Sequence, residues 1–165
     1  MLSFHTRMSG GKGFSLIEML VSLTILGILA SVTIPYAEVA IKRQQEAELR
    51  QSLRIIRTAI DEFHRDWSQE AIVRADGNSS RTGYPKTLDV LLEGVELTGS
   101  QEIKKYLRRL PQDPLAENGL PVEQHWALRS SQDDPQSTIW GGEDVYDVTV
   151  NHDRVALDGS NYREW

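Results

Sequence analysis

Cysteine is absent from the 165 residues. Without thiols the chain has neither a disulfide framework nor a thiolate metal site, and its redox compartment is left open. The sequence also contains no G-x-S-x-G, no P-loop and no H-E-x-x-H motif, and its histidines, at positions 5, 64, 125 and 152, form no pair at metal-ligand spacing. These absences argue against the common classes of hydrolase, nucleotide-binding enzyme and metalloprotease.

Positive charge is also scarce. The chain has 18 Lys and Arg residues against 24 Asp and Glu residues, a formal net charge of -6. An acidic surface is repelled by a phosphate backbone, so nucleic acid is not an expected partner.

The apolar residues are concentrated in one run, residues 14–34. As a helix these residues rise roughly 31 Å at about 1.5 Å each, which matches a hydrocarbon core of about 30 Å. A secretory signal peptide is the alternative, but its apolar region is shorter and ends at a small-x-small site. Here the nearest small residues, Ala37 and Ala40, are three apart. The run therefore predicts a membrane-spanning helix.

Glu18 places a carboxylate near the start of this run. A charge at the centre of a spanning helix costs roughly 2.5 to 3.5 kcal/mol on insertion scales, less near the helix end, and usually marks function. We therefore expect a partner that compensates it. The sequence GGKG before Phe14 offers a flexible, exposed peptide bond at the membrane surface.

A short basic leader with Arg7 and Lys12 ends in Gly13, is followed by Phe14, and has Glu18 as the fifth residue of the remaining chain. This pattern resembles the class III signal of type IV pilins and pseudopilins. The resemblance implies that a prepilin peptidase cuts between Gly13 and Phe14 and methylates the new amino group of Phe14. It divides the chain into a leader (1–13), a transmembrane and filament-core helix (14–34) and a periplasmic pilin-like globular domain (35–165).

The resemblance also implies a role for two further residues in assembly. In this family the fifth-position carboxylate, here Glu18, is neutralised by the N-terminal amine of a neighbouring subunit. Pro35 matches another family position, where it removes a backbone donor from the helix. A simple helix end is the alternative explanation of Pro35.

The orientation of the span comes from the resemblance and not from charge. Arg7 and Lys12 precede the run, whereas four basic residues follow it within about 20 residues, so the positive-inside rule favours the opposite orientation. The basic residues after the run are Lys42, Arg43, Arg50 and Arg54.

Beyond the run, the spacing predicts a continuing amphipathic helix. Its apolar side chains alternate at intervals of four and three, which places them on one face. The charged residues between them predict the i, i+4 ion pairs Glu46–Arg50 and Asp61–Arg65. Residues 75–87 predict a loop, residues 88–92 a short helix and residues 103–110 a third helix that Pro111 stops. The apolar stripe consists of Leu49, Leu53, Ile56, Ile60, Phe63 and Trp67.

In the C-terminal third of the sequence, the spacing of the apolar residues changes. HWALRSS, DVYDVTV and RVALDG are partly alternating and are separated by turn residues, so they predict strands of a small antiparallel sheet. The expected fold class is therefore α+β, pilin-like, with the long N-terminal helix packed on this sheet. We expect His64 on the solvated side of the helix, and His125 and His152 in surface or turn positions.

Three further parts of the sequence resemble one member of this family in particular, the major pseudopilin of type II secretion systems. They are Tyr84-Pro85, YLRRLPQDP (residues 106–114) and Trp165. This implies a structural, non-enzymatic subunit in the bacterial inner membrane. Its implied partners are copies of itself, the prepilin peptidase, minor pseudopilins and the inner-membrane assembly platform. The alternatives are a minor pilin or pseudopilin of a type IV pilus system and, from another class, a single-span anchored enzyme or sensor.

The chain departs from that pseudopilin in its last loop, where the family has a longer calcium loop rich in Gly and Asp. Asp153, Asp158 and Asn161 offer oxygen ligands for a calcium ion, which takes six to eight of them. Their spacing matches no EF-hand, and a turn at Asp158-Gly159 explains the same residues equally well. Calcium is therefore a possible cofactor of the terminal loop.

Overall fold

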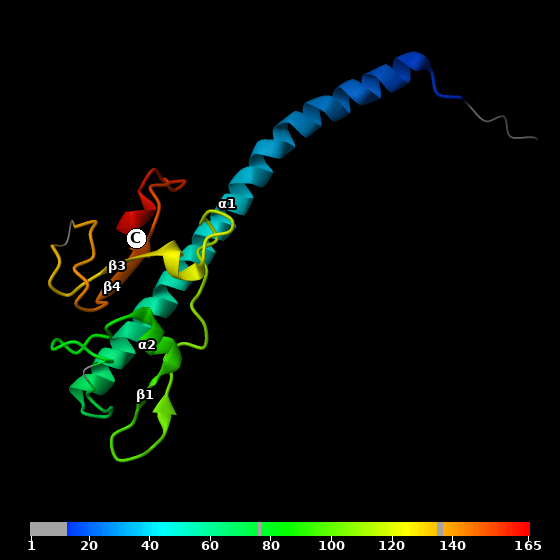
Figure 1. Ribbon diagram of the computed structural model, residues 1–165. Coiled ribbons are helices and arrows are strands. Elements are labelled where there is room, and N and C mark those ends of the chain that lie inside the picture. Colours follow the sequence, from blue (N-terminus) through cyan, green and yellow to red (C-terminus); the bar gives the residue numbers. More distant parts are fainter. Residues whose placement is uncertain (1–12, 76, 135–136) are drawn as a thin grey trace, which may run out of the picture. The chain divides into compact units, whose positions relative to one another are not determined.

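One long helix and a set of short elements make up the protein, which is shown as a computed structural model in Figure 1. The structure describes residues 13–75, 77–134 and 137–165, without the side chains of residues 32–35. Helix α1 (Leu16–Ser68) runs through two compact units, one ending at Ala40 and the other comprising Ile41–Trp165. Most of the expected leader, residues 1–12, lies outside the described residues.

In the first unit α1 carries apolar side chains around its whole circumference. Leu16 is 80% exposed, Ile17 66% and Leu20 55%, and the apolar residues up to Leu29 are similarly exposed. This part of α1 is long and apolar enough to cross a membrane. The helix continues through Pro35 and does not end there.

In the second unit α1 supplies one wall of the core. The predicted stripe is confirmed, because Leu49, Leu53, Ile56, Ile60 and Phe63 are each at most 2% exposed, and Trp67 packs against them partly buried. Residues at this spacing lie on one face of a helix, so the remaining elements of the unit must cover that face.

Short elements cover the stripe. The first group is helix α2 (Leu88–Glu93) followed by the antiparallel pair β1 (Val95–Glu96) and β2 (Ile103–Lys104). The second is the antiparallel pair β3 (Trp126–Arg129) and β4 (Asp147–Val150), flanked by the 3-10 turns η1 (Val122–His125) and η2 (Tyr162–Glu164). Trp126 lies opposite Val150, and Arg129 lies opposite Asp147.

The expected third helix at residues 103–110 is wrong. Residues 103 and 104 form β2, and the N–H groups of Tyr106 and Leu107 both donate to the carbonyl of Leu91 in α2. The ammonium of Lys104 lies 2.6 Å from a carboxylate oxygen of Asp66 on α1. These bonds to neighbouring elements replace the internal bonds that a helix would need.

The glycine at the end of α2 explains how the chain passes from the helix into β1. Gly94, with φ of 86°, caps the helix and leads directly into β1. An added Cβ would lie 2.5 Å from the carbonyl oxygen of Lys104 on β2. Only glycine combines this backbone conformation with so close a neighbouring strand.

The strands expected in HWALRSS and DVYDVTV are present as β3 and β4, whereas RVALDG forms only an isolated bridge between Val155 and Asn161. The sheet is thus reduced to two strands beside the β1–β2 pair. A long N-terminal helix followed by small antiparallel sheets is an α+β, pilin-like fold, as the sequence predicts.

A buried carboxylate holds the loops around β3 and β4 together. Asp144 is fully buried and accepts hydrogen bonds from the hydroxyls of Ser80, Thr82, Ser130 and Ser131 and from the N–H of Ser131. Burial by itself raises the pKa of Asp144, but these hydrogen bonds outweigh it and leave the pKa below its ordinary value.

The lowered pKa of Asp144 predicts acid sensitivity. The folded chain binds this proton more weakly than the unfolded chain, whose aspartate pKa is about 3.9, so the stabilisation is present at neutral pH and is lost as pH falls through the folded pKa. For a fragment beginning at Tyr36, we expect Asp144→Asn to lower the free energy of unfolding at pH 7 by about 1 to 3 kcal/mol, since an amide cannot accept all five bonds.

The measurement is urea unfolding between pH 7 and pH 3, with the exposed Asp61→Asn as a matched control. The difference in stability between Asp144→Asn and the original sequence should shrink toward pH 3, while the control stays close to the original at every pH. A difference that is independent of pH would contradict the role given to the carboxylate.

Candidate functional site

The N-terminal segment contains the residues to which the sequence assigns processing and assembly. Gly13 and Phe14 precede α1, Phe14 is 74% exposed, and a Cβ added at Gly13 would meet nothing within 4 Å. Within the described chain, the peptide bond between these two residues is therefore accessible.

Glu18 lies in the first turn of α1 and is exposed. The N–H groups of a first helical turn have no partners within the helix and attract negative charge, so this position is the least unfavourable one for a carboxylate in the apolar run. The partial positive charge of the helix terminus offsets the negative charge of Glu18 only in part. Its predicted partner, an amine from another subunit, belongs to an assembly of several chains.

Pro35 is the other predicted assembly residue. Its main chain belongs to α1, and its side chain lies outside the described residues. Because proline has no N–H, the helix lacks one hydrogen bond at this point.

The segment YLRRLPQDP is attached to its surroundings through Asp113, a buried residue. One carboxylate oxygen of Asp113 accepts from the N–H of Leu115 at 2.7 Å, and the other lies 3.0 Å from Nε2 of His152. The N–H of Asp113 donates to Nδ1 of His125. Besides this local bond to Leu115, the segment is thus connected to two separate parts of the second unit, at His125 and at His152.

Two histidines therefore have different environments from those expected. His125 is only 8% exposed and bridges the N–H of Asp113 and the carbonyl of Leu120. The side chain of His152 is largely buried against Asp113. Neither is a simple surface residue, and no local pattern in the sequence indicates that residues 113, 125 and 152 meet.

His64 is also not simply solvated. It is half-buried, and its ring stacks on that of Tyr84 with 4.2 Å between ring centroids. The loop at Tyr84-Pro85 therefore packs against this side of α1.

The polar face of α1 binds the C-terminal segment. The ammonium of Lys42 donates to the carbonyl of Val155, and Glu46 accepts from the N–H of Leu157 and the hydroxyl of Tyr162. Burial, and then the hydrogen bond to Glu46, raise the pKa of the Tyr162 hydroxyl. The expected Glu46–Arg50 ion pair is wrong, because Glu46 makes these contacts and the guanidinium of Arg50 lies 3.8 Å from the centroid of a Trp165 ring.

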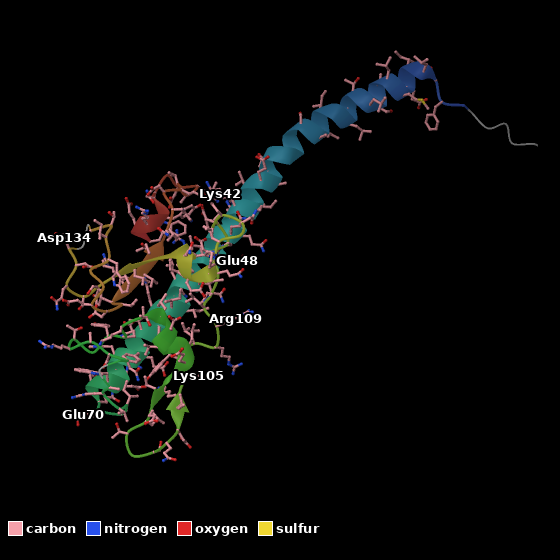
Figure 2. All side chains as sticks on the ribbon, viewed as in Figure 1. Lys42, Glu48, Glu70, Lys105, Arg109 and Asp134 are labelled. Carbon is pink, nitrogen blue, oxygen red and sulfur yellow. The ribbon has the colours of Figure 1, made fainter. Side chains whose placement is uncertain are left out.

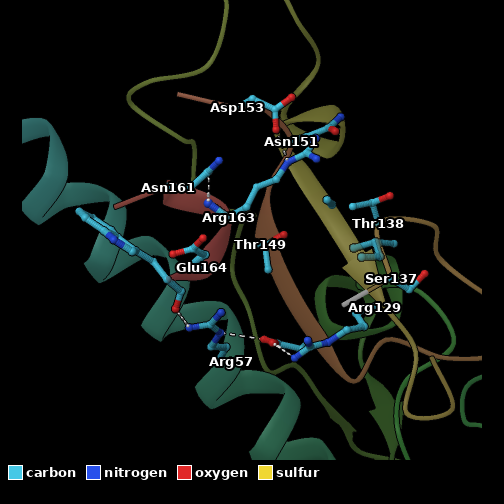
Figure 3. A pocket seen from close by; sticks show the side chains of 14 residues that line it. Arg57, Arg129, Ser137, Thr138, Thr149, Asn151, Asp153, Asn161, Arg163 and Glu164 are labelled. Atoms are coloured by element: carbon cyan, nitrogen blue, oxygen red, sulfur yellow. Dashed lines mark hydrogen bonds and ion pairs between the residues drawn. The ribbon is translucent and has the colours of Figure 1, made fainter. Parts of the chain in front are cut away.

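Arg57 continues this attachment further along α1. It donates to a carboxylate oxygen of Asp147 at 2.8 Å, to the main-chain oxygen of Trp165 at 2.7 Å and to the carbonyl of Val148 at 3.0 Å. Arg129 reaches the other carboxylate oxygen of Asp147 at 2.6 Å (Figure 3). The spacing of 42, 46 and 50 is visible in the sequence, but the segment that these residues bind is not.

A polar groove of about 840 Å³ lies over the outer face of β3 and β4 (Figure 3). Ala127 and Thr149 are among the residues that line it, and Arg57 and Arg129 reach it from two sides. Its basic residues pair with its own acidic residues, Arg57 and Arg129 with Asp147 and Arg163 with Asp153.

The candidate calcium ligands are engaged in separate local contacts. Asp153 pairs with Arg163 at 3.2 Å, and the side-chain oxygen of Asn161 accepts from the N–H of Arg163. Asp158 accepts from both the N–H and the hydroxyl of Ser160, and these bonds lower the pKa of its carboxyl group. Within residues 13–75, 77–134 and 137–165, no three His, Asp or Glu side chains form a group that could hold a metal ion.

Residues 8–34 match a family described as the prokaryotic N-terminal methylation motif. No solved structure matches the chain. The matched segment contains Gly13, Phe14 and Glu18 and ends just before Pro35. The N-terminal segment is therefore a type IV pilin-like prepilin signal, and together with α1 it fits a membrane-anchored, single-pass subunit of the pilin and pseudopilin type.

Calcium binding by the terminal loop stays a prediction with a direct test. A ligand that binds only the folded state raises its stability by mass action, so removal of a bound ion would lower the melting temperature. For the fragment beginning at Tyr36 we expect little or no shift on addition of a chelator, because Asp158 is satisfied by Ser160. A large calcium-dependent shift that Asp158→Ala abolishes would contradict this expectation.

Proposed function

We propose that this chain is the membrane-inserted precursor of the major subunit of a type II secretion pseudopilus. After cleavage and methylation, its copies assemble through their apolar helices into a periplasmic filament that drives protein export. The observation that carries the proposal is Glu18, one carboxylate in the first turn of an exposed apolar helix, inside a match to the methylation motif.

The physical basis is the change in environment of α1 on assembly. In the membrane monomer, Glu18 lies near the start of the span, within reach of water and of the partial positive charge of the helix terminus. In a bundle of such helices, the carboxylate becomes buried and requires a cation, which the amine of Phe14 from an adjacent chain supplies. Apolar contacts alone leave axial register weakly defined, and the charge pair fixes it.

The choice of a pseudopilus over a type IV pilus rests on the YLRRLPQDP segment. The segment resembles the major pseudopilin in sequence, and in this chain its buried Asp113 attaches it to His125 and His152. A minor pilin or pseudopilin of a type IV pilus system shares the signal but not this segment. An anchored enzyme or sensor leaves Glu18 without a role.

Processing is the first test. Intact mass of the protein extracted from membranes should show the loss of residues 1–13 and the gain of one methyl group. We expect Gly13→Ala to be processed much better than Gly13→Val, because the peptidase must admit a residue with almost no side chain. Since a Cβ added at position 13 meets nothing within 4 Å, we expect a difference between the two variants to report on the peptidase. A mature N-terminus at Met1, or one created after residue 37, would contradict the proposal.

Assembly is the second test. Glu18→Ala should insert normally and be cleaved, yet fail to form filaments, because loss of one member of a buried pair costs about 3 to 5 kcal/mol. Glu18→Gln, which keeps the size but not the charge, should fail in the same way. Glu38→Ala, which removes another exposed glutamate of α1 outside the apolar run, is the matched control.

The measurements are membrane fractionation, intact mass, the yield of sheared filaments and the secretion of exported protein. Normal filament yield and normal secretion by cleaved Glu18→Ala would show that Glu18 does not set the register. That result would favour the anchored enzyme or sensor.

A further inference from the structure

The second unit has an exposed surface at the point where α1 enters it. We call this surface the tether end; it consists of residues 41–43 of α1 and residues 154–157 of the C-terminal segment. The two parts are joined by the hydrogen bond of 2.9 Å from the Lys42 ammonium to the Val155 carbonyl. Lys42 marks this place in Figure 2.

Chain connectivity keeps the tether end near the membrane. Ile34 is the last residue of the apolar run, and Ile41 follows it by seven residues. Seven residues rise about 10 Å as a helix, and they reach at most about 25 Å when fully extended. The headgroup layer itself is roughly 5 to 8 Å thick on each side of the hydrocarbon core. Ile41, where the tether end begins, therefore lies at most about 25 Å beyond the end of the apolar run, whichever way the unit turns.

The tether end also exposes apolar side chains. Ile41 is 59% exposed, Val155 51% and Leu157 41%. Between the last two, Ala156 is buried, so the segment turns one side chain inward and two outward. Tyr36, an exposed residue of the first unit, belongs to the aromatic type that is enriched at membrane interfaces.

The charge of the tether end has the opposite sign to that of the whole chain. Lys42 bonds to a carbonyl, which leaves its positive charge intact, and Arg43 and Arg154 are exposed and form no ion pair with a described carboxylate. Among the neighbouring acidic side chains, Asp153 pairs with Arg163, whereas Glu46 and Asp158 accept hydrogen bonds from uncharged groups and keep their negative charge beside the tether end. A surface of this kind favours anionic headgroups beside a shallow apolar layer.

We propose that the tether end docks on the surface of an anionic lipid bilayer while the chain is a membrane monomer. Val155 and Leu157 enter the boundary between headgroups and acyl chains, and Arg43 and Arg154 contact lipid phosphates. The inference rests on the proposed function only in requiring that residues 14–34 span the membrane. Lipid docking would set the orientation of the second unit before assembly.

The absence of cysteine makes a site-specific test possible in the full chain. Single Leu157→Cys and Ile139→Cys variants carry a spin label and are reconstituted at one copy per nanodisc, with or without anionic lipid. Ile139, which is 79% exposed and lies in the loop between β3 and β4, is the control position. Leu157→Cys keeps the main-chain N–H that donates to Glu46. The measurement compares label accessibility to oxygen, which partitions into lipid, and to a water-soluble nickel complex.

In anionic nanodiscs, the label at 157 should be more accessible to oxygen and less accessible to nickel than the label at 139. Arg43→Gln and Arg154→Gln should each lower the ratio of lipid-facing to water-facing label about fivefold, as expected for one basic residue at an anionic surface. The exposed Arg81→Gln is the matched control and should leave the ratio unchanged. A rise in salt should lower the ratio in the original chain by screening these charges.

Equal nickel accessibility at 157 and 139 in anionic nanodiscs would overturn the proposal. So would protection of position 157 that arises only with several copies per disc, because the tether end would then contact a second chain. Failure of the chain to enter nanodiscs at all would instead contradict the membrane span, and with it the proposed function.

Discussion

Burial of the α1 stripe is the interaction on which the second unit depends. Its other elements among the described residues are a six-residue helix, two pairs of strands of two or four residues and two 3-10 turns. Two-stranded sheets of this length are marginal by themselves, and short isolated helices are unstable in water. The side chains from Leu49 to Phe63 give these pieces a common apolar surface, so α1 organises a unit that has little regular structure of its own.

The polar face of α1 also makes contacts within the second unit. Lys42, Glu46, Arg50 and Arg57 each contact the last eleven residues of the chain, through hydrogen bonds or through the Trp165 ring. The C-terminal segment is therefore held along about four turns of the helix. This arrangement connects the two ends of the second unit, and it brings Val155 and Leu157 to the place where α1 enters.

In the first unit, the surface of α1 is suited to a different environment. Between Leu16 and Ile28 the apolar side chains of α1 are exposed on every side of the helix. A membrane satisfies such a helix, and so does a bundle of identical helices. Glu18 is consistent with both, because it lies at the end of the run where water, the helix terminus or a neighbouring amine can compensate it.

The sequence predicted the structure correctly where a single periodicity or a single motif determines it. The stripe from Leu49 to Phe63 predicted the face that α1 buries, and the signal around Gly13, Phe14 and Glu18 predicted the match to the methylation motif. The short α2 and the strands β3 and β4 also followed from periodicity and turn residues. In each case the residues that decide the structure are close neighbours in the chain.

Contacts between distant residues decided the rest. Residues 103–107 have a helix-like pattern, yet they bond to β1, α2 and Asp66, which lie elsewhere in the chain. Glu46 has Arg50 at ion-pair spacing, yet it binds Leu157 and Tyr162, more than 100 residues further on. Asp113 and Asp144 look like surface aspartates in the sequence. Only the tertiary structure surrounds them with donors, because a buried carboxylate is tolerated only where the fold assembles partners from several segments.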